Sequence, residues 1–92
     1  MLMLIYYMQF VYLLENKIDK SWYIGFTTNL KKRLKEHLSG LGGKTTSSKK
    51  QWKLIYFECY LNKIDALGRE RFLKSGSGRK YIKKQLRNYF SV

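Results

Sequence analysis

The segment 22–37 limits most strongly what this chain can fold into, because it predicts a strand that runs directly into a helix. Residues 22–26 are mostly aromatic or β-branched, which is typical of a partly buried strand. The Thr-Thr-Asn run at 27–29 offers three residue types that cap the first turn of a helix. Leucines then recur every fourth residue, as on the apolar side of a helix, at Leu30, Leu34 and Leu38. Gly40 is expected to end this helix.

Four polar or small residues of this segment are expected to form a concave site. Arg33 and His37 are four residues apart, so they share one side of the predicted helix, next to the leucines. The preceding strand carries Tyr23 and Gly25. The absence of a side chain at Gly25 leaves room for a backbone or a phosphate group to come close.

The remaining sequence predicts a single α+β domain over residues 8–90, preceded by an apolar extension at 1–7. Residues 9–15 and 21–27 are expected to pair as an antiparallel hairpin, and 51–60 predicts a third strand with strict alternation of its faces. Asn62 is expected to cap a second helix, which the Ser-Gly-Ser-Gly run at 75–78 interrupts. A third helix is expected from about Arg79 to Tyr89.

The composition favours an anionic partner. The chain has 92 residues with 19 basic and 6 acidic side chains, giving a formal net charge of +13. Such a surface attracts polyanions, so DNA is the expected partner, with RNA as an alternative. The side chains expected to contact phosphates are Lys31, Lys32, Lys35, Lys44, Lys49, Lys50, Lys53, Arg79 and Lys80. The domain is expected to be a monomer or a weak homodimer.

The single cysteine and the apolar start of the chain indicate in which cellular compartment the protein is expected. Cys59 is the one cysteine, so no internal disulfide forms; this fits a reducing, cytoplasmic environment, and a buried strand position is expected for it. Residues 1–14 are apolar but too short to span a bilayer, and they lack the features of a signal peptide. A protein anchored to a membrane surface by this segment is the third-ranked interpretation.

Glu70 is the most informative acidic residue, because it lies among apolar residues on the predicted inner side of the second helix. A carboxylate in such a place is costly unless it is paired or bound to a metal. One interpretation is an ion pair with Arg69, Lys74 or Arg33. The other is a ligand for one Mg²⁺, which takes one or two protein carboxylates together with water and phosphate. The sequence has no second acidic pair for a two-metal site.

Other side chains also have both a structural and a chemical interpretation. Arg33 is either a solvated arginine or a bidentate phosphate ligand that offsets transition-state charge. His37 either packs as a neutral ring or moves a proton. Tyr12 and Tyr23 are either packing residues or phenols whose pKa is lowered by nearby positive charge.

In their order along the chain, Tyr12, the Tyr-Ile-Gly run at 23–25, Arg33, His37 and Glu70 make the sequence resemble a GIY-YIG endonuclease domain. The resemblance covers about residues 8–90 and is strongest to the small stand-alone group similar to the nuclease domain of UvrC. The second motif is intact, whereas Phe-Val-Tyr at 10–12 stands where the first motif has Gly-Ile-Tyr.

The resemblance implies a three-stranded antiparallel sheet flanked by three helices. It also implies Mg²⁺-dependent hydrolysis of DNA phosphodiesters, with Mn²⁺ as the alternative ion, and a role in DNA repair or recombination. Tyr12 or Tyr23 would help to deprotonate water, Arg33 would bind the scissile phosphate, and Glu70 would hold the metal. Asn88 is the one candidate for an asparagine that many members carry late in the domain. A non-catalytic nucleic-acid-binding module with the same fold is the alternative.

Overall fold

A computed structural model describes residues 8–39 and 51–91, and its centre is an antiparallel sheet of three strands. The strands are β1 (Gln9–Asn16), β2 (Trp22–Thr27) and β3 (Trp52–Tyr60), in the spatial order β2-β1-β3. β2 and β3 therefore pair with the two edges of β1, and its residues are buried on both faces. This burial explains why the sequence of β1 is a continuous run of mostly apolar residues. The α+β class and the predicted hairpin are both confirmed.

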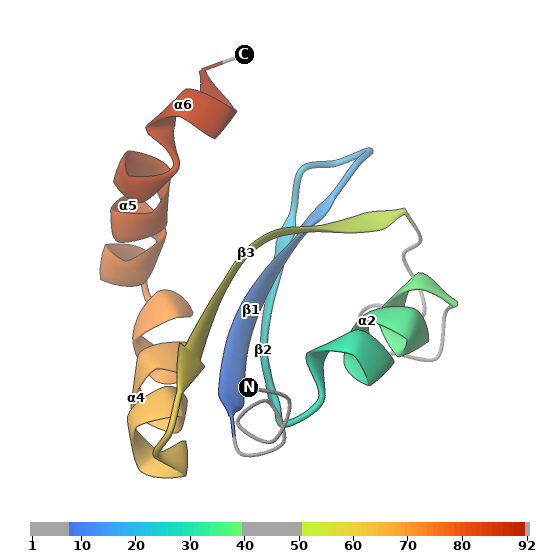
Figure 1. Ribbon diagram of the computed structural model, residues 1–92. Coiled ribbons are helices and arrows are strands. Elements are labelled where there is room, and N and C mark those ends of the chain that lie inside the picture. Colours follow the sequence, from blue (N-terminus) through green and yellow to red (C-terminus); the bar gives the residue numbers. More distant parts are fainter. Residues whose placement is uncertain (1–7, 40–50, 92) are drawn as a thin grey trace.

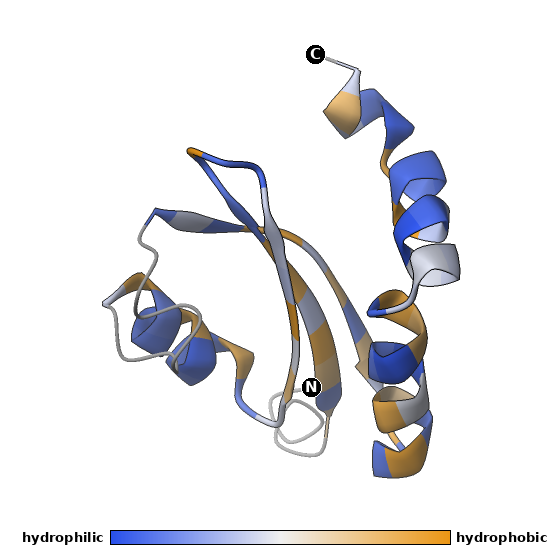
Figure 2. Ribbon diagram, turned by 180° about the vertical axis from the view of Figure 1, so that it is seen from behind, coloured by the Kyte–Doolittle hydropathy of each residue, from blue (hydrophilic) through white to orange (hydrophobic). Residues whose placement is uncertain are grey.

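The helices are divided between the two faces of the sheet (Figure 1). α2 (Leu30–Leu38) covers one face, whereas α4 (Lys63–Leu73), α5 (Gly76–Gln85) and the one-turn α6 (Arg87–Phe90) follow one another along the other. Hydrophobic residues gather in the strands and along α4, and most of α2 and α5 is hydrophilic (Figure 2). The core has two parts accordingly: Val11, Leu13, Ala66, Leu73 and Ile82 on the α4 side, and Tyr12, Leu14 and Trp52 on the α2 side.

Side-chain caps fix where three of the helices begin. The Asn29 side chain accepts a hydrogen bond from the backbone of Lys32, and Asn62 accepts from two backbone N–H groups at the start of α4. These bonds satisfy donors that a helix leaves free at its first turn. Both helix starts agree with the positions predicted from the sequence.

The strict alternation predicted for β3 is wrong, because the strand contains a bulge. Leu14 pairs with Leu54, but Leu13 pairs with Tyr56, so Ile55 is an extra residue. A bulge shifts the faces of everything beyond it. Leu54 therefore packs with the α2 side of the core, whereas Tyr56 packs with the α4 side.

The predicted start of the third helix is also wrong: α5 begins at Gly76 and includes both glycines of the interrupting run. Ser75 caps it by accepting from the backbone of Gly78. Gly78 is buried against α4, where an added Cβ would lie 2.0 Å from the carbonyl oxygen of Phe72. The glycine is there because the two helices meet backbone to backbone, and a further break at Leu86 then separates α6 from α5.

Two single-residue expectations are corrected as well. Leu38 is 66% exposed, and His37 takes the inner position in its place. On a helix, position 37 lies closer than position 38 to the side shared by positions 30 and 34. Cys59 is exposed because it lies near the end of edge strand β3. The expectations for residues 1–7, Gly40, Lys44, Lys49 and Lys50 lie outside the described residues. Within the described ranges, no helix has the length and apolar character needed to cross a bilayer.

Candidate active site

Tyr12 is at the centre of the candidate site, and Gly25 on the neighbouring strand determines where its ring can lie. The two residues are direct partners in the β1–β2 register. An ideal Cβ on Gly25 would lie 2.4 Å from the phenol oxygen of Tyr12, so any other residue would collide with the ring. Because β2 is an edge strand, the glycine lets the Tyr12 hydroxyl reach across it toward the rim of the sheet.

His37 packs against this phenol from α2. Its Nε2 atom lies 2.8 Å from the Tyr12 hydroxyl, and the imidazole is 2% exposed. The ring of Tyr23 lies 4.9 Å from the imidazole, centroid to centroid, and 6.3 Å from the ring of Tyr12. The three rings therefore form one cluster between β1, β2 and α2.

The protonation states in this cluster follow from burial and from one nearby cation. Burial is the main cause that lowers the pKa of His37 to about 4, and the positive charge of Arg33 contributes to the same shift, so the imidazole is neutral near pH 7. Burial also raises the pKa of Tyr12 to about 12, despite a hydrogen bond from Arg33 that acts in the other direction. A neutral phenol and a neutral imidazole can share this hydrogen bond in one of two ways, and the Tyr12 hydroxyl donates to Nε2 in the tautomer that carries its proton on Nδ1.

Arg33 connects the tyrosines to the surface of α2. Burial lowers its pKa, but hydrogen bonds to Glu36, Tyr12 and Tyr23 outweigh this effect and raise the pKa overall. The guanidinium also forms an ion pair with Glu36, with Nη1 and Oε1 at 3.1 Å. The Arg33 side chain is 29% exposed, so a phosphate in solution can reach it.

Glu70 approaches the same region from α4, on the other side of the sheet. Its charge contributes to the raised pKa of Tyr12, which places it within electrostatic range of the phenol. The carboxylate is 19% exposed and lies 3.2 Å from Nζ of Lys74. The ion pair expected under the structural interpretation is therefore present, although its lysine is 55% exposed and such a pair contributes little to stability.

In the part of the chain that the structure describes, Glu70 is a single carboxylate and not part of a larger group of metal ligands. Among residues 8–39 and 51–91, no three His, Cys, Asp or Glu side chains come together as a metal-binding group. Mg²⁺ does not need such a group, because it keeps several waters and takes one or two carboxylates together with phosphate oxygens. Glu58 of β3, a further carboxylate on the α4 side, is already bonded to Arg69 by two hydrogen bonds of 2.9 and 3.0 Å.

The predicted phosphate ligands that the structure describes do not form one continuous group. Lys31, Lys32 and Lys35 lie exposed on α2, the helix that carries Arg33. Lys53 and Arg79 lie instead around a separate cavity near Glu15, described below, and Lys80 is exposed on α5. Asn88 lies exposed in α6, and the structure gives it no contact with Glu70.

A comparison with known protein families matches residues 8–87 to the GIY-YIG catalytic domain. The chain belongs to the GIY-YIG family. The match extends from the start of β1 to the first residue of α6, so it includes Tyr12, Tyr23, Arg33, His37 and Glu70. The degenerate first motif of this GIY-YIG domain thus keeps its tyrosine in the clustered position described above.

Relatives of similar size support the assignment to GIY-YIG. A UPF0213 protein of Clostridium perfringens is 46% identical over 67 residues, which are 73% of this chain and 71% of that protein. One of Haloquadratum walsbyi is 39% identical over 66 residues, covering 72% and 73% of the two chains. The solution NMR structure of the UPF0213 protein of Bacillus halodurans matches with a TM-score of 0.52 at 38% identity, over 89% of this chain and 84% of that one.

Sequence reasoning left one feature open and missed another. Lys74 was one of three candidates for pairing with Glu70, and the structure selects it. Glu15 was considered the end of a core strand, yet it is buried and bonded to Trp22 and to Tyr89, 74 residues later. A glutamate at the end of an apolar strand was the available signal, but its partners depend on how α6 packs.

Proposed function

We propose that this GIY-YIG protein is a Mg²⁺-dependent endonuclease that hydrolyses DNA phosphodiester bonds. The observation that supports it best is the hydrogen-bonded group of Tyr12, His37 and Arg33 at the rim of the sheet, with Glu70 nearby. Buried phenol, neutral imidazole and guanidinium together can move a proton and bind an anion.

Arg33 would bind the scissile phosphate. Its planar guanidinium can donate two parallel hydrogen bonds to phosphate oxygens and offset the charge that develops as water attacks. Its exposure and its position beside both tyrosines agree with this role. Removing one such donor typically lowers the rate by about 10²–10³.

Tyr12 would take the proton from the attacking water while passing its own proton to His37. A phenol with a pKa of about 12 is a poor base by itself at neutral pH, but the 2.8 Å contact with Nε2 provides a route for its proton. A bound phosphate would offset the charge of Arg33, which now lowers the pKa of His37, so substrate binding would make the imidazole more basic.

Glu70 would hold the metal ion, with the remaining ligands coming from water and the substrate phosphate. A bound Mg²⁺ supplies Lewis-acid stabilisation of the developing charge. In the free protein Lys74 lies at the carboxylate, so it would have to move aside when the cation binds. That ion pair is also the observation that favours the alternative, a binding module in which Glu70 is structural.

A cleavage assay tests the proposal. Purified protein is incubated with end-labelled single strands, duplexes, flaps and junctions, in Mg²⁺ and in EDTA. We expect cleavage of at least one substrate in Mg²⁺ alone, and a loss of about 10²–10³ in Arg33→Ala. Arg71→Ala is the matched control, because Arg71 is an exposed arginine of α4. Equal cleavage by both variants, or none by the wild type, would contradict the proposal.

A further inference from the structure

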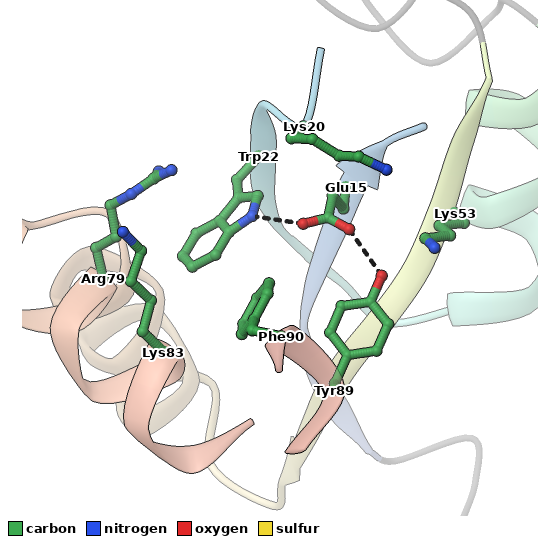
Figure 3. A pocket seen from close by; sticks show the side chains of 8 residues that line it. All are labelled: Glu15, Lys20, Trp22, Lys53, Arg79, Lys83, Tyr89 and Phe90. Carbon is green, nitrogen blue, oxygen red and sulfur yellow. Dashed lines mark hydrogen bonds between the residues drawn. The ribbon is translucent and has the colours of Figure 1, made fainter. Parts of the chain in front are cut away.

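A cavity of about 590 Å³ lies on the face of the sheet that carries α5 and α6 (Figure 3). Its walls come from the ends of β1, β2 and β3 and from both of those helices. Tyr12 and His37 are not among its lining residues, so it is separate from the proposed catalytic cluster. No step of the proposed hydrolysis uses it.

A buried carboxylate forms the floor of this cavity. Glu15 is 5% exposed, and each of its oxygens accepts one hydrogen bond: Oε1 from the Tyr89 hydroxyl at 2.7 Å and Oε2 from Nε1 of Trp22 at 3.3 Å. Figure 3 shows both bonds converging on the carboxylate from opposite sides. A carboxylate offers about four acceptor positions, so two remain for a donor that enters the cavity.

Cationic side chains surround this carboxylate. The cavity is lined by Lys20, Lys53, Arg79 and Lys83. Against one buried negative charge they leave the cavity strongly positive, which suits a ligand that carries a phosphate and also presents hydrogen-bond donors.

The cavity walls also offer aromatic surfaces. The Trp22 and Phe90 rings are stacked at 5.6 Å, and the guanidinium of Arg79 lies 4.1 Å from the centre of the Trp22 ring. The Tyr89 ring is 38% exposed, with Nζ of Lys53 at 5.2 Å from its centre. Exposed aromatic rings and arginine planes are the surfaces on which unpaired bases stack.

A neighbouring cavity lies between β2 and the junction of α4 and α5. It measures about 380 Å³ and shares Trp22 and Arg79 with the first cavity. Its other lining residues include Tyr23 of the catalytic cluster and Lys74, the partner of Glu70. A strand of nucleic acid bound at Arg33 can therefore continue around β2 into the larger cavity.

We propose that the cavity around Glu15 binds one unpaired nucleotide of the substrate strand, next to the nucleotide that is cut. Its phosphate contacts Lys83 and the other cations, its base stacks on the Tyr89 ring, and Glu15 accepts from a base amino group. A base within an intact duplex cannot enter, because both of its faces are already stacked on neighbouring bases and it stays paired inside the helix. This inference rests on the proposed nuclease function, and it assigns that function a substrate with a single-stranded segment beside the cut.

Binding measurements in EDTA test the inference without requiring cleavage. A labelled strand of about ten nucleotides is compared with the same strand in a blunt duplex. We expect Tyr89→Ala to weaken single-strand binding about tenfold and to leave duplex binding within about twofold, because stacking on one ring is lost. Tyr89→Phe keeps the ring and is expected to retain most single-strand affinity. Equal losses on both DNAs, or none, would overturn the inference.

A lysine pair provides a test that does not depend on how α6 packs. Lys83 lines the cavity and Lys84 does not, although both are exposed on α5. We expect Lys83→Ala to weaken single-strand binding several times more than Lys84→Ala does. Equal effects would mean that both lysines belong to a general basic surface, and the inference would be wrong even if the protein cleaves DNA.

Base preference tests the role of Glu15. Cytosine presents an amino donor where thymine presents a carbonyl acceptor. We therefore expect an all-cytosine strand to bind more tightly than an all-thymine strand at pH 8, and Glu15→Gln to reduce this difference. An equal affinity of the wild type for both strands would overturn the base contact.

Discussion

At the scale of single residues, the buried histidine makes the clearest prediction about pH. The pKa of His37 is about 4 in the folded protein against an ordinary value of 6.5, so protons bind preferentially to the unfolded chain below pH 6.5. The stability that the neutral imidazole provides is complete above pH 6.5 and is lost as the pH falls toward 4. Between pH 7.5 and 5 we expect the free energy of unfolding to fall by roughly 1–2 kcal/mol, and the melting temperature by several degrees.

A matched variant isolates this effect. His37 is the one histidine of the chain, so this variant removes the one imidazole. In His37→Gln the melting temperature should change little between pH 7.5 and 5. The same pH dependence in the wild type and in His37→Gln would mean that the imidazole is not the group that titrates.

The tyrosines give a second prediction at this scale. Tyr12→Phe removes the hydroxyl that contacts Nε2 of His37, and Tyr23→Phe removes one that bonds Arg33 but not His37. We expect the first change to lower the single-turnover cleavage rate by about 10² or more, and the second to lower it less. Near wild-type rates in both variants would make the tyrosines packing residues.

At the scale of the elements, the two glycines of α5 differ in what surrounds them: Gly78 packs against α4, whereas Gly76 has open space beside it. An added Cβ at Gly78 would lie 2.0 Å from the backbone oxygen of Phe72, whereas one at Gly76 would meet nothing within 4 Å. We expect Gly78→Ala to destabilise the fold by about 2 kcal/mol or more through the forced shift of α5. Gly76→Ala should instead stabilise it by about 0.4–1 kcal/mol. Chemical denaturation measures both, and equal effects would contradict the close contact between α4 and α5.

The same elements show what could be predicted from the sequence. The strand-to-helix segment 22–37 was predictable because alternation, caps and leucine spacing are local signals, and they agree there. The bulge at Ile55 was not, because it depends on how β3 pairs with β1. The contact between Glu15 and Tyr89 was not predictable either, since no local pattern links residues 74 positions apart.

The sequence named the residues of the candidate site, but it did not indicate their protonation states or their hydrogen bonds. The residue pattern singled out Arg33 and Glu70, and the resemblance added their roles and that of Tyr12. The protonation states depend on burial, which a sequence pattern does not give. The hydrogen bond between Tyr12 and a neutral His37 is the main addition, because the proposed mechanism uses it to give the proton of the phenol a route.

At the scale of the whole molecule, the net charge of +13 predicts a steep dependence of DNA binding on salt. The logarithm of the affinity should fall with the logarithm of salt concentration by about 0.9 for each phosphate neutralised on duplex DNA. Replacing Lys31, Lys32 and Lys35 together by glutamine should make this slope shallower and weaken binding alike on unrelated sequences. Titrations at several salt concentrations measure both, and an unchanged slope would exclude this side of α2 as a binding surface.

The central claim is that Glu70 takes part in metal-dependent cleavage, and a paired measurement on Glu70→Gln tests it most directly. DNA affinity is measured in EDTA and cleavage in Mg²⁺ and in Mn²⁺, with thermal melts of the wild type, Glu70→Gln and Lys74→Ala. We predict that Glu70→Gln stays folded, binds DNA at least as tightly as the wild type, and cleaves with neither ion, because the site has lost its charged ligand. Retained cleavage, together with a lowered melting temperature that Lys74→Ala reproduces, would contradict the claim and make Glu70 an ion-pair residue of α4.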